Sequence, residues 1–136
     1  MCAVFASETQ VLDLVAPGAV SIAAVNAPDN VVISGEGAAV RDAVARLEAE
    51  GIRTEPLAVS HAFHSHLMEP MLDEFEKVAA GVTSAPARLA FVSNVTGRLM
   101  RGDFASPAYW RTHVRSTVKF AESMGALQRW ATASEG

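Results

Sequence analysis

The sequence has few of the features that mark secreted, membrane-spanning or nucleic-acid-binding proteins. Its 136 residues include one cysteine, Cys2, so no internal disulfide can form, which is typical of a reducing cytoplasm. No apolar run approaches the ~20 residues that cross a bilayer, and no signal peptide is expected. Lys and Arg number 11 and are scattered, and the net charge is −4, so nucleic acid is not an expected partner.

The sequence also lacks the pattern that presents a serine nucleophile. The elbow G-x-S-x-G does not occur, and Ser34-Gly35 has Val32 where the first glycine of that pattern belongs. The Gly35–Gly37 turn resembles part of a dinucleotide-binding turn, but Val40 stands at the position of the third glycine. Any chemistry by a serine would therefore have to come from residues outside this sequence.

The apolar content is high enough for a folded core, since 50% of the residues are hydrophobic and 19% are charged. Periodicity and turn signals in residues 1–60 predict six elements in the order strand, helix, strand, strand, helix, strand. The strands are expected at 1–6, 20–25, 31–33 and 52–59. The first helix is expected to begin at the capping box Ser7–Gln10 and to end near 16–18, and the second, with Val40, Ala43, Val44 and Leu47 on one face, to end at Gly51. The hairpin turn is Ala27–Asn30. This βαββαβ order predicts a ferredoxin-like subdomain.

Residues after 60 have a different character and predict helix and strand segments without a repeat. An amphipathic helix follows a cluster of histidines, and its apolar face carries Met68, Met71, Leu72, Phe75 and Ala79. Next we expect a break at Ala85-Pro86, a strand at 89–93, a turn at 94–97, a helix starting at Ser106-Pro107 and a last helix around 118–127. The sequence thus predicts an α+β fold with a subdomain at 1–60, further segments at 61–131 and a tail at 132–136.

Three histidines, His61, His64 and His66, lie within six residues and allow three interpretations. Zinc binding is one, but no Cys or acidic residue stands nearby at metal spacing, so we expect no metal. The second is a set of packed or solvated loop histidines. The third is a general base just before a helix that Ser65 caps. Asn94 and His113, taken alone, are more simply a turn former and a surface residue.

Five segments in order and spacing resemble the acyltransferase domains of modular type I polyketide synthases. Residues 57–72, which read LAVSHAFHSHLMEPML, are similar to the family segment VSHAFHSxLMEPML. Residues 1–4, 24–35, 92–97 and 109–120 are similar to the family segments MAAV, AxNxPxxxVxSG, SNVTG and YWxxHVRxxVxF. The resemblance extends to about Leu127, and five ordered motifs make a chance match improbable.

The resemblance implies an enzyme of secondary metabolism, such as antibiotic biosynthesis, that moves a malonyl unit from coenzyme A to a serine. The unit then passes to the phosphopantetheine thiol of an acyl carrier protein, with other synthase domains as further partners and no bound cofactor. His64 matches the catalytic histidine, and His113 matches the residue whose main-chain carbonyl orients it. His61, Phe63 and Asn94 match positions near the substrate. The variant His61-Ala-Phe-His64 is associated with malonyl units, whereas Tyr-Ala-Ser-His is associated with branched units.

The sequence departs from the family in one respect that bears on activity. The family's α/β-hydrolase-like large subdomain, which carries the G-H-S-x-G elbow, normally precedes this region and is mostly missing here. We therefore expect an incomplete acyltransferase domain that is inactive alone and leaves Leu67, Met71, Phe75 and Phe91 exposed. The alternative is a non-catalytic ferredoxin-like binding module that docks a carrier protein or a small metabolite.

Overall fold

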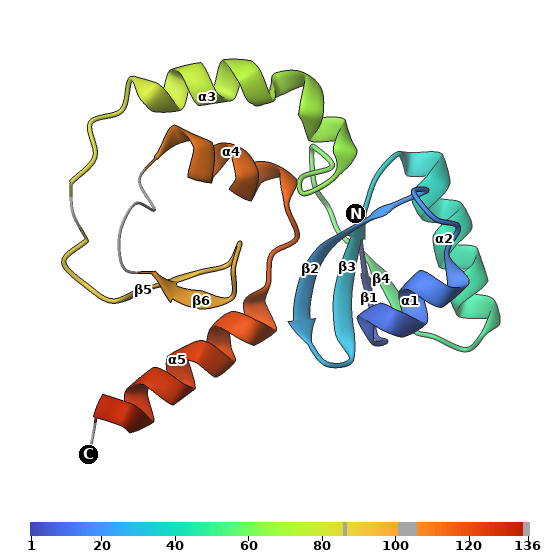
Figure 1. Ribbon diagram of the computed structural model, residues 1–136. Coiled ribbons are helices and arrows are strands. Elements are labelled where there is room, and N and C mark those ends of the chain that lie inside the picture. Colours follow the sequence, from blue (N-terminus) through green and yellow to red (C-terminus); the bar gives the residue numbers. More distant parts are fainter. Residues whose placement is uncertain (86, 101–105, 135–136) are drawn as a thin grey trace.

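The computed structural model describes residues 1–85, 87–100 and 106–134. The strands are β1 (Cys2–Val4), β2 (Ser21–Ala27), β3 (Asn30–Ser34), β4 (Thr54–Pro56), β5 (Phe91–Ser93) and β6 (Arg98–Met100). The helices are α1 (Glu8–Leu14), α2 (Gly37–Ala49), α3 (Leu72–Ala80), α4 (Pro107–Arg115) and α5 (Phe120–Ser134), and η1 (His66–Met71) is a short 3-10 helix. Figure 1 shows a sheet with two helices on one side and, beside it, an arc of η1, α3 and α4 over the β5–β6 hairpin.

The first four strands form an antiparallel sheet in the order β2-β3-β1-β4, with α1 and α2 on one face (Figure 1). This arrangement confirms the predicted α+β fold with a ferredoxin-like part. Alternate residues of β1, Cys2 and Val4, face the helices, so Cys2 is a buried apolar residue. The core lies between the sheet and the two helices and consists of Cys2, Val4, Ala6, Val11, Val15, Val31, Ile33, Val40, Ala43 and Leu47.

Local signals account for the limits of the first two helices. Ser7 and Gln10 form the predicted capping box, in which each side chain accepts a hydrogen bond from the other's main-chain N–H, at 3.3 and 3.1 Å. Helix α2 ends before Gly51, whose φ of +75° lies in the left-handed region that glycine adopts without strain. Strand β4 is shorter than the predicted 52–59, although the Leu57 amide still donates to the Met1 carbonyl at 3.1 Å.

The helix expected after Ser65 is interrupted at Pro70. Residues His66–Met71 form the 3-10 helix η1, and α3 begins only at Leu72. Proline has no N–H for an α-helical bond to the residue four positions earlier, and Pro70 lies well beyond the first helical position, so the turn before it is 3-10 and the α-helical bonding begins after it. Of the four side chains expected to be exposed, Met71 is 39% exposed, whereas Leu67, Phe75 and Phe91 are half-buried.

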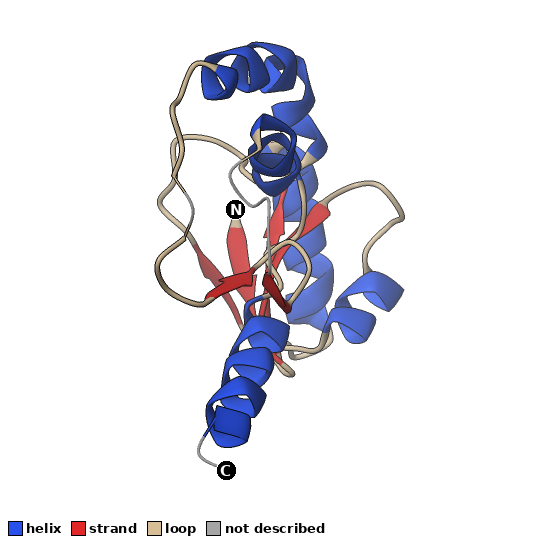
Figure 2. Cartoon of the chain, turned by 60° about the vertical axis from the view of Figure 1, so that its left-hand side comes forward, coloured by secondary structure: helices blue, strands red, loops and turns tan. Residues whose placement is uncertain are grey.

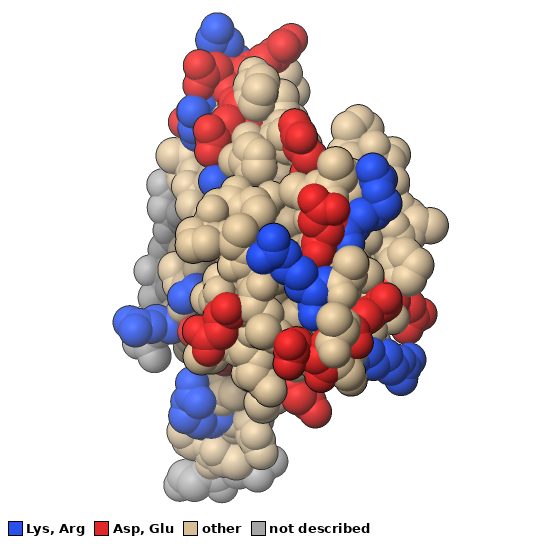
Figure 3. All heavy atoms as spheres, turned by 90° about the vertical axis from the view of Figure 1, so that its right-hand side faces the viewer, with Lys and Arg blue, Asp and Glu red and all other residues tan. Residues whose placement is uncertain are grey.

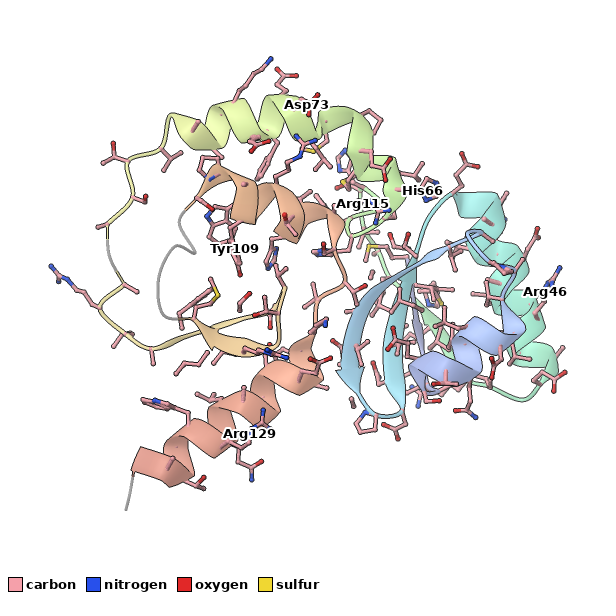
Figure 4. The ribbon with its side chains drawn as sticks, viewed as in Figure 1. Arg46, His66, Asp73, Tyr109, Arg115 and Arg129 are labelled. Atoms are coloured by element: carbon pink, nitrogen blue, oxygen red, sulfur yellow. The ribbon has the colours of Figure 1, made fainter. Side chains whose placement is uncertain are left out.

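Ion pairs join η1 and α3 to α4. Arg111 Nη1 lies 2.6 Å from Asp73 Oδ1 and 3.1 Å from Glu76 Oε2. One turn further along α4, Arg115 Nε lies 2.9 Å from Glu69 Oε1, and Figure 4 shows Arg115 directed toward η1. Helix α4 is therefore joined by ion pairs to α3 near its middle and to η1 at its C-terminal end.

The end of the chain is more regular than expected. Helix α5 runs outward from the body toward the C-terminus (Figure 2) and continues to Ser134, so residues 132–134 of the predicted tail are helical. Residues 135 and 136 of that predicted tail, like Pro86 of the predicted break, lie outside the described residues. The boundary at residue 60 between the two expected parts stays a prediction.

The surface over α1 and α2 is mixed in charge. Acidic and basic side chains are interspersed over the face formed by α1 and α2 (Figure 3), as the scattered charges of the sequence predict. Among the described residues, none of the helices combines the length and apolar character needed to span a bilayer.

Two glycines with left-handed backbone provide a matched test of packing between α5 and the β5–β6 turn. Gly97 has φ +68°, and a Cβ added there would lie 2.6 Å from Glu122 Oε2 and 2.7 Å from Glu122 Cβ. Gly18 has φ +76° and open space around the same position. Both Gly→Ala changes should cost about 1–2 kcal/mol of unfolding free energy for the backbone conformation, but Gly97→Ala should cost about 1–3 kcal/mol more, because Glu122 Cβ is fixed to a helix.

Urea unfolding of the two variants measures this difference directly. Alanine at position 122 keeps the Cβ atom that an alanine at position 97 would contact, but glycine removes it. The double variant Gly97→Ala/Glu122→Gly should therefore lose the stability cost that this contact adds to Gly97→Ala. Equal losses of stability for Gly18→Ala and Gly97→Ala would contradict the packing of α5 against this turn.

Candidate active site

The candidate site is centred on His64, in the loop between the sheet and η1. With φ +59°, it is the one non-glycine residue of positive φ among those that the structure describes. Such a conformation costs roughly 1–3 kcal/mol and persists where surrounding contacts enforce it, which is common at functional sites. One enforcing contact is the hydrogen bond from the His64 amide to the Val114 carbonyl, at 3.1 Å.

The ring of His64 is fixed by a second main-chain carbonyl. Its Nδ1 lies 2.8 Å from the carbonyl oxygen of Ser116. A carbonyl oxygen can only accept, so Nδ1 must carry the proton, and the neutral ring then has its lone pair on Nε2. This is the tautomer in which a histidine can accept a proton from a substrate or a nucleophile.

The loop before η1 is closed by the buried Ser65. Its Oγ donates to the Ala62 carbonyl at 2.6 Å and accepts from the Leu67 amide at 3.2 Å, so the hydroxyl is satisfied and caps η1. The sequence-based expectation that Ser65 is the N-cap is confirmed. The cap joins the loop rigidly to the helix and limits the positions open to His64.

His113 lies beside His64, but the predicted mode of contact is wrong. The carbonyl that accepts from His64 Nδ1 is that of Ser116, not that of His113. The reason is that His113 lies inside α4, where carbonyls point along the helix axis, whereas Ser116 follows the helix in extended backbone and turns its carbonyl sideways. The rings of His113 and His64 instead meet edge to face, with centroids 5.9 Å apart.

The surroundings of His113 disfavour its charged form. Burial lowers the pKa of His113 below the usual 6.5, and the neighbouring His64 lowers it further. Its ring also contacts those of Tyr109 and Trp110, with centroids 6.1 and 5.6 Å away. Figure 4 shows Tyr109 directed from α4 toward the β5–β6 hairpin, where its hydroxyl lies 2.8 Å from Ser93 Oγ.

The remaining predicted site residues fall in two places. His61 and Phe63 share the loop of His64, and their rings tilt against each other with centroids 5.8 Å apart. Phe63 is 43% exposed. Asn94 lies in the β5–β6 turn, where its carbonyl accepts from the Lys119 amide at 2.8 Å. Residues 1–85, 87–100 and 106–134 contain no group of three His, Cys, Asp or Glu side chains arranged to hold a metal ion.

The segment after α4 holds the contacts that sequence reasoning missed. Thr117 Oγ1 donates to the Ile22 carbonyl at 2.7 Å, and Val118 pairs with β2 through bonds to Ala23 and Val25 at 2.8 and 2.9 Å. Any residue can supply a main-chain carbonyl, so no side-chain pattern could have singled out Ser116. The β-branched pair Thr117-Val118 after a helix was the available signal for extended backbone.

Comparison with known proteins decides the family. The model of the family described as "Acyl transferase domain" matches residues 1–134. The chain belongs to the acyl transferase domain family. It is 55% identical over 128 residues to the phenolphthiocerol synthesis polyketide synthase type I Pks15/1 of Mycobacterium bovis, a match that covers 94% of this chain and 6% of that protein.

Solved acyl transferase structures agree with the fold. The chain superposes on the acyltransferase domain from the second module of the salinomycin polyketide synthase with a TM-score of 0.86 and 45% identity, over 94% of this chain and 30% of that one. It superposes on the malonyl-CoA:acyl carrier protein transacylase of Xanthomonas oryzae with a TM-score of 0.84 and 29% identity, over 94% and 43%. The resemblance predicted from the five motifs is thus confirmed, and the chain spans less than half of either acyl transferase structure.

The lowered pKa of His113 predicts a pH-dependent stability. The unfolded chain binds a proton at a higher pH than the folded one, so the free energy of unfolding should fall as the pH falls through 6.5 and level off below the folded pKa. His113→Gln removes this contribution, so its stability should change less between about pH 7.5 and about pH 5.5. Urea unfolding across this range measures the slope, and His66→Gln, on the exposed side of η1, is the matched control. A slope that His113→Gln leaves intact would contradict the assignment.

Proposed function

We propose that these residues form the C-terminal part of an acyltransferase domain that moves a malonyl unit from coenzyme A to an acyl carrier protein. His64 is the general base. The hydrogen bond between His64 Nδ1 and the Ser116 carbonyl carries this proposal, because it leaves Nε2 of the neutral ring free to accept a proton. The family match and the likeness to a malonyl-CoA:acyl carrier protein transacylase support the reaction class.

The proposed reaction has two transfers that use the same nitrogen. Nε2 of His64 takes the proton of a serine hydroxyl as its oxygen attacks the thioester, and it returns that proton to the departing coenzyme A sulfur. In the second transfer Nε2 takes the proton of the phosphopantetheine thiol, the sulfur attacks the acyl-serine, and the proton returns to the serine oxygen. Nδ1 keeps its proton on the Ser116 carbonyl throughout, which stabilises the imidazolium formed in each transfer.

The serine of this scheme comes from polypeptide outside the 136 residues, because they contain no G-x-S-x-G elbow. The same holds for the donors of the oxyanion hole. This chain contributes the base, the carbonyl that orients it and the ferredoxin-like sheet. Acyl-coenzyme A, the acyl carrier protein and the other domains of a polyketide synthase are the proposed partners.

We assign the acyl-group preference to the loop that carries the base. Phe63 is next to His64 in the chain, its side chain is 43% exposed, and its ring tilts against that of His61. A phenylalanine there occupies the volume that an α-methyl group of a branched unit needs, which favours malonyl. One methyl group is worth about 1–3 kcal/mol, so branched units are disfavoured but not excluded. Asn94 is assigned to the neighbourhood of the substrate and to no chemical step.

The role of His64 is tested by His64→Asn in the intact acyltransferase domain. Asparagine tolerates positive φ better than alanine does, so the loop should keep its shape while the base is lost. We expect malonyl transfer to fall about 10²–10⁴-fold, measured with labelled malonyl-coenzyme A and a carrier protein. His66→Asn, two residues further on, is the control and should retain transfer.

Two outcomes would contradict the proposal. One is full transfer by His64→Asn, which together with retained carrier-protein binding would favour a non-catalytic binding module. The other is unaided loading of labelled malonyl by the 136-residue chain alone, which would show that the nucleophile lies within it.

The specificity assignment is tested by Phe63→Ser in the same intact domain. Removing the ring should lower the ratio of kcat/KM for malonyl over methylmalonyl by about 10–200-fold, because the α-methyl group then fits. Phe5→Ser, at another partly exposed phenylalanine on the first strand's end, is the matched control and should leave the ratio unchanged. An unaltered ratio in Phe63→Ser would remove Phe63 from the acyl pocket.

A further inference from the structure

The chain between α4 and α5 is fixed at almost every residue. The Ser116 amide donates to the Thr112 carbonyl at 2.9 Å, and the Ser116 carbonyl accepts from His64 Nδ1 at 2.8 Å. Beyond it, Thr117 and Val118 bond to β2, and Lys119 donates to the Asn94 carbonyl at 2.8 Å. This short stretch therefore connects the base with the edge of the ferredoxin-like sheet and with the β5–β6 turn.

The orientation of the Ser116 carbonyl depends on both ends of its peptide plane. The plane is rigid, so its carbonyl can swing only by rotation about the bonds at the Cα atoms of Ser116 and Thr117. On the Ser116 side, the bond from the Ser116 amide to Thr112 holds the preceding peptide in line with α4. On the other side, the Thr117 hydroxyl is bonded at 2.7 Å to the Ile22 carbonyl of β2, and the Val118 amide is bonded at 2.8 Å to the Ala23 carbonyl.

We propose that Thr117 is a positioning residue of the acyl transfer reaction, whose hydroxyl holds the Ser116 carbonyl against His64 Nδ1. The proposal rests on the proposed role of His64 as the base. The Thr117 hydroxyl donates to the Ile22 carbonyl, whereas His64 Nδ1 is bonded to the Ser116 carbonyl, so the proposed influence of Thr117 on His64 passes through one peptide plane.

The chemistry of the residue supports the assignment. A hydroxyl can donate to a carbonyl of β2, which valine of the same shape cannot do, and the branched Cβ limits the number of rotamers from which it donates. Thr117 is half-buried, so water competes only partly for the Ile22 carbonyl. Losing the hydroxyl leaves only the main-chain bonds of Val118 to Ala23 and Val25 to hold this side of the Ser116 peptide against β2.

The arrangement also couples the sheet to the base. Because Ile22, Ala23 and Val25 of β2 bind the residues that directly follow Ser116, any displacement of β2 relative to η1 acts on the hydrogen bond to His64. The ferredoxin-like part thereby takes part in orienting the base, although it supplies no side chain to the reaction.

The test compares three variants by two independent measurements. Thr117→Val removes the hydroxyl at constant shape, Thr117→Ser keeps it, and Thr132→Val makes the same change at an exposed α5 threonine that bonds only within its helix. In the 136-residue chain, ¹⁵N NMR reports the His64 tautomer; we expect Nδ1–H in the native chain and Thr117→Ser, and a mixture with Nε2–H in Thr117→Val. In the intact domain, Thr117→Val should lower kcat about 10-fold with KM within about 2-fold, while Thr117→Ser and Thr132→Val stay near the native value.

The remaining outcomes overturn the proposal. An unchanged tautomer and kcat in Thr117→Val would show that the Ser116 carbonyl needs no such anchor. Equal losses in Thr117→Val and Thr117→Ser would assign the effect to packing of the methyl group. If neither Thr117→Val nor Thr117→Ala folds, Thr117 serves stability and the proposal fails. His64→Asn, measured in parallel, separates the failure of the two proposals. Full transfer by His64→Asn would refute the role of His64 as the base, whereas the tautomer measurement tests the role of Thr117 without depending on turnover.

Discussion

The hydrogen bond from His64 Nδ1 to the Ser116 carbonyl is the interaction on which the site depends. It joins residues 52 positions apart and fixes both the tautomer and the direction of the imidazole. A second bond, from the His64 amide to Val114, keeps the backbone in a strained left-handed conformation that would otherwise relax. The histidine is thus bonded directly to main-chain carbonyls at the end of α4, those of Val114 and Ser116.

The ion pairs around the site are less suited to fixing the orientation of His64 than these main-chain hydrogen bonds. The pairs that Arg111 and Arg115 make with α3 and η1 involve carboxylates as exposed as that of Asp73, at 83%, and such pairs are screened by water and salt. The main-chain bonds of residues 114–119 are short, partly shielded and directional. We therefore attribute the alignment of α4 with η1 in part to the ion pairs. The position of the His64 ring we attribute to its hydrogen bonds with main-chain carbonyls. The polar contact of Tyr109 with the buried Ser93 adds a fixed point at the other end of α4.

Sequence patterns predicted those features that are written in side chains. The Ser7–Gln10 capping box, the stop at Gly51 and the ferredoxin-like order of elements each follow from residue types at fixed spacing, and the structure agrees with them. The same reasoning placed the base at His64 but assigned its orienting carbonyl to His113, because a family motif identifies a position and not the direction of its carbonyl. The positive φ of His64 and the pairing of Val118 with β2 were likewise beyond reach, since both arise from contacts between distant segments.

The pairing of residues 117 and 118 with β2 has a consequence for how the site is assembled during folding. Thr117 and Ile22 are separated by 95 positions, so closing this contact requires nearly the whole chain, and contacts of such separation are slow to form. The capping box, the β2–β3 hairpin and the ferredoxin-like core need only local or intermediate contacts and can form while residues beyond 60 are still being synthesised. We therefore expect the imidazole to acquire its orientation in one of the last steps of folding, after the sheet that receives residues 117 and 118 has formed.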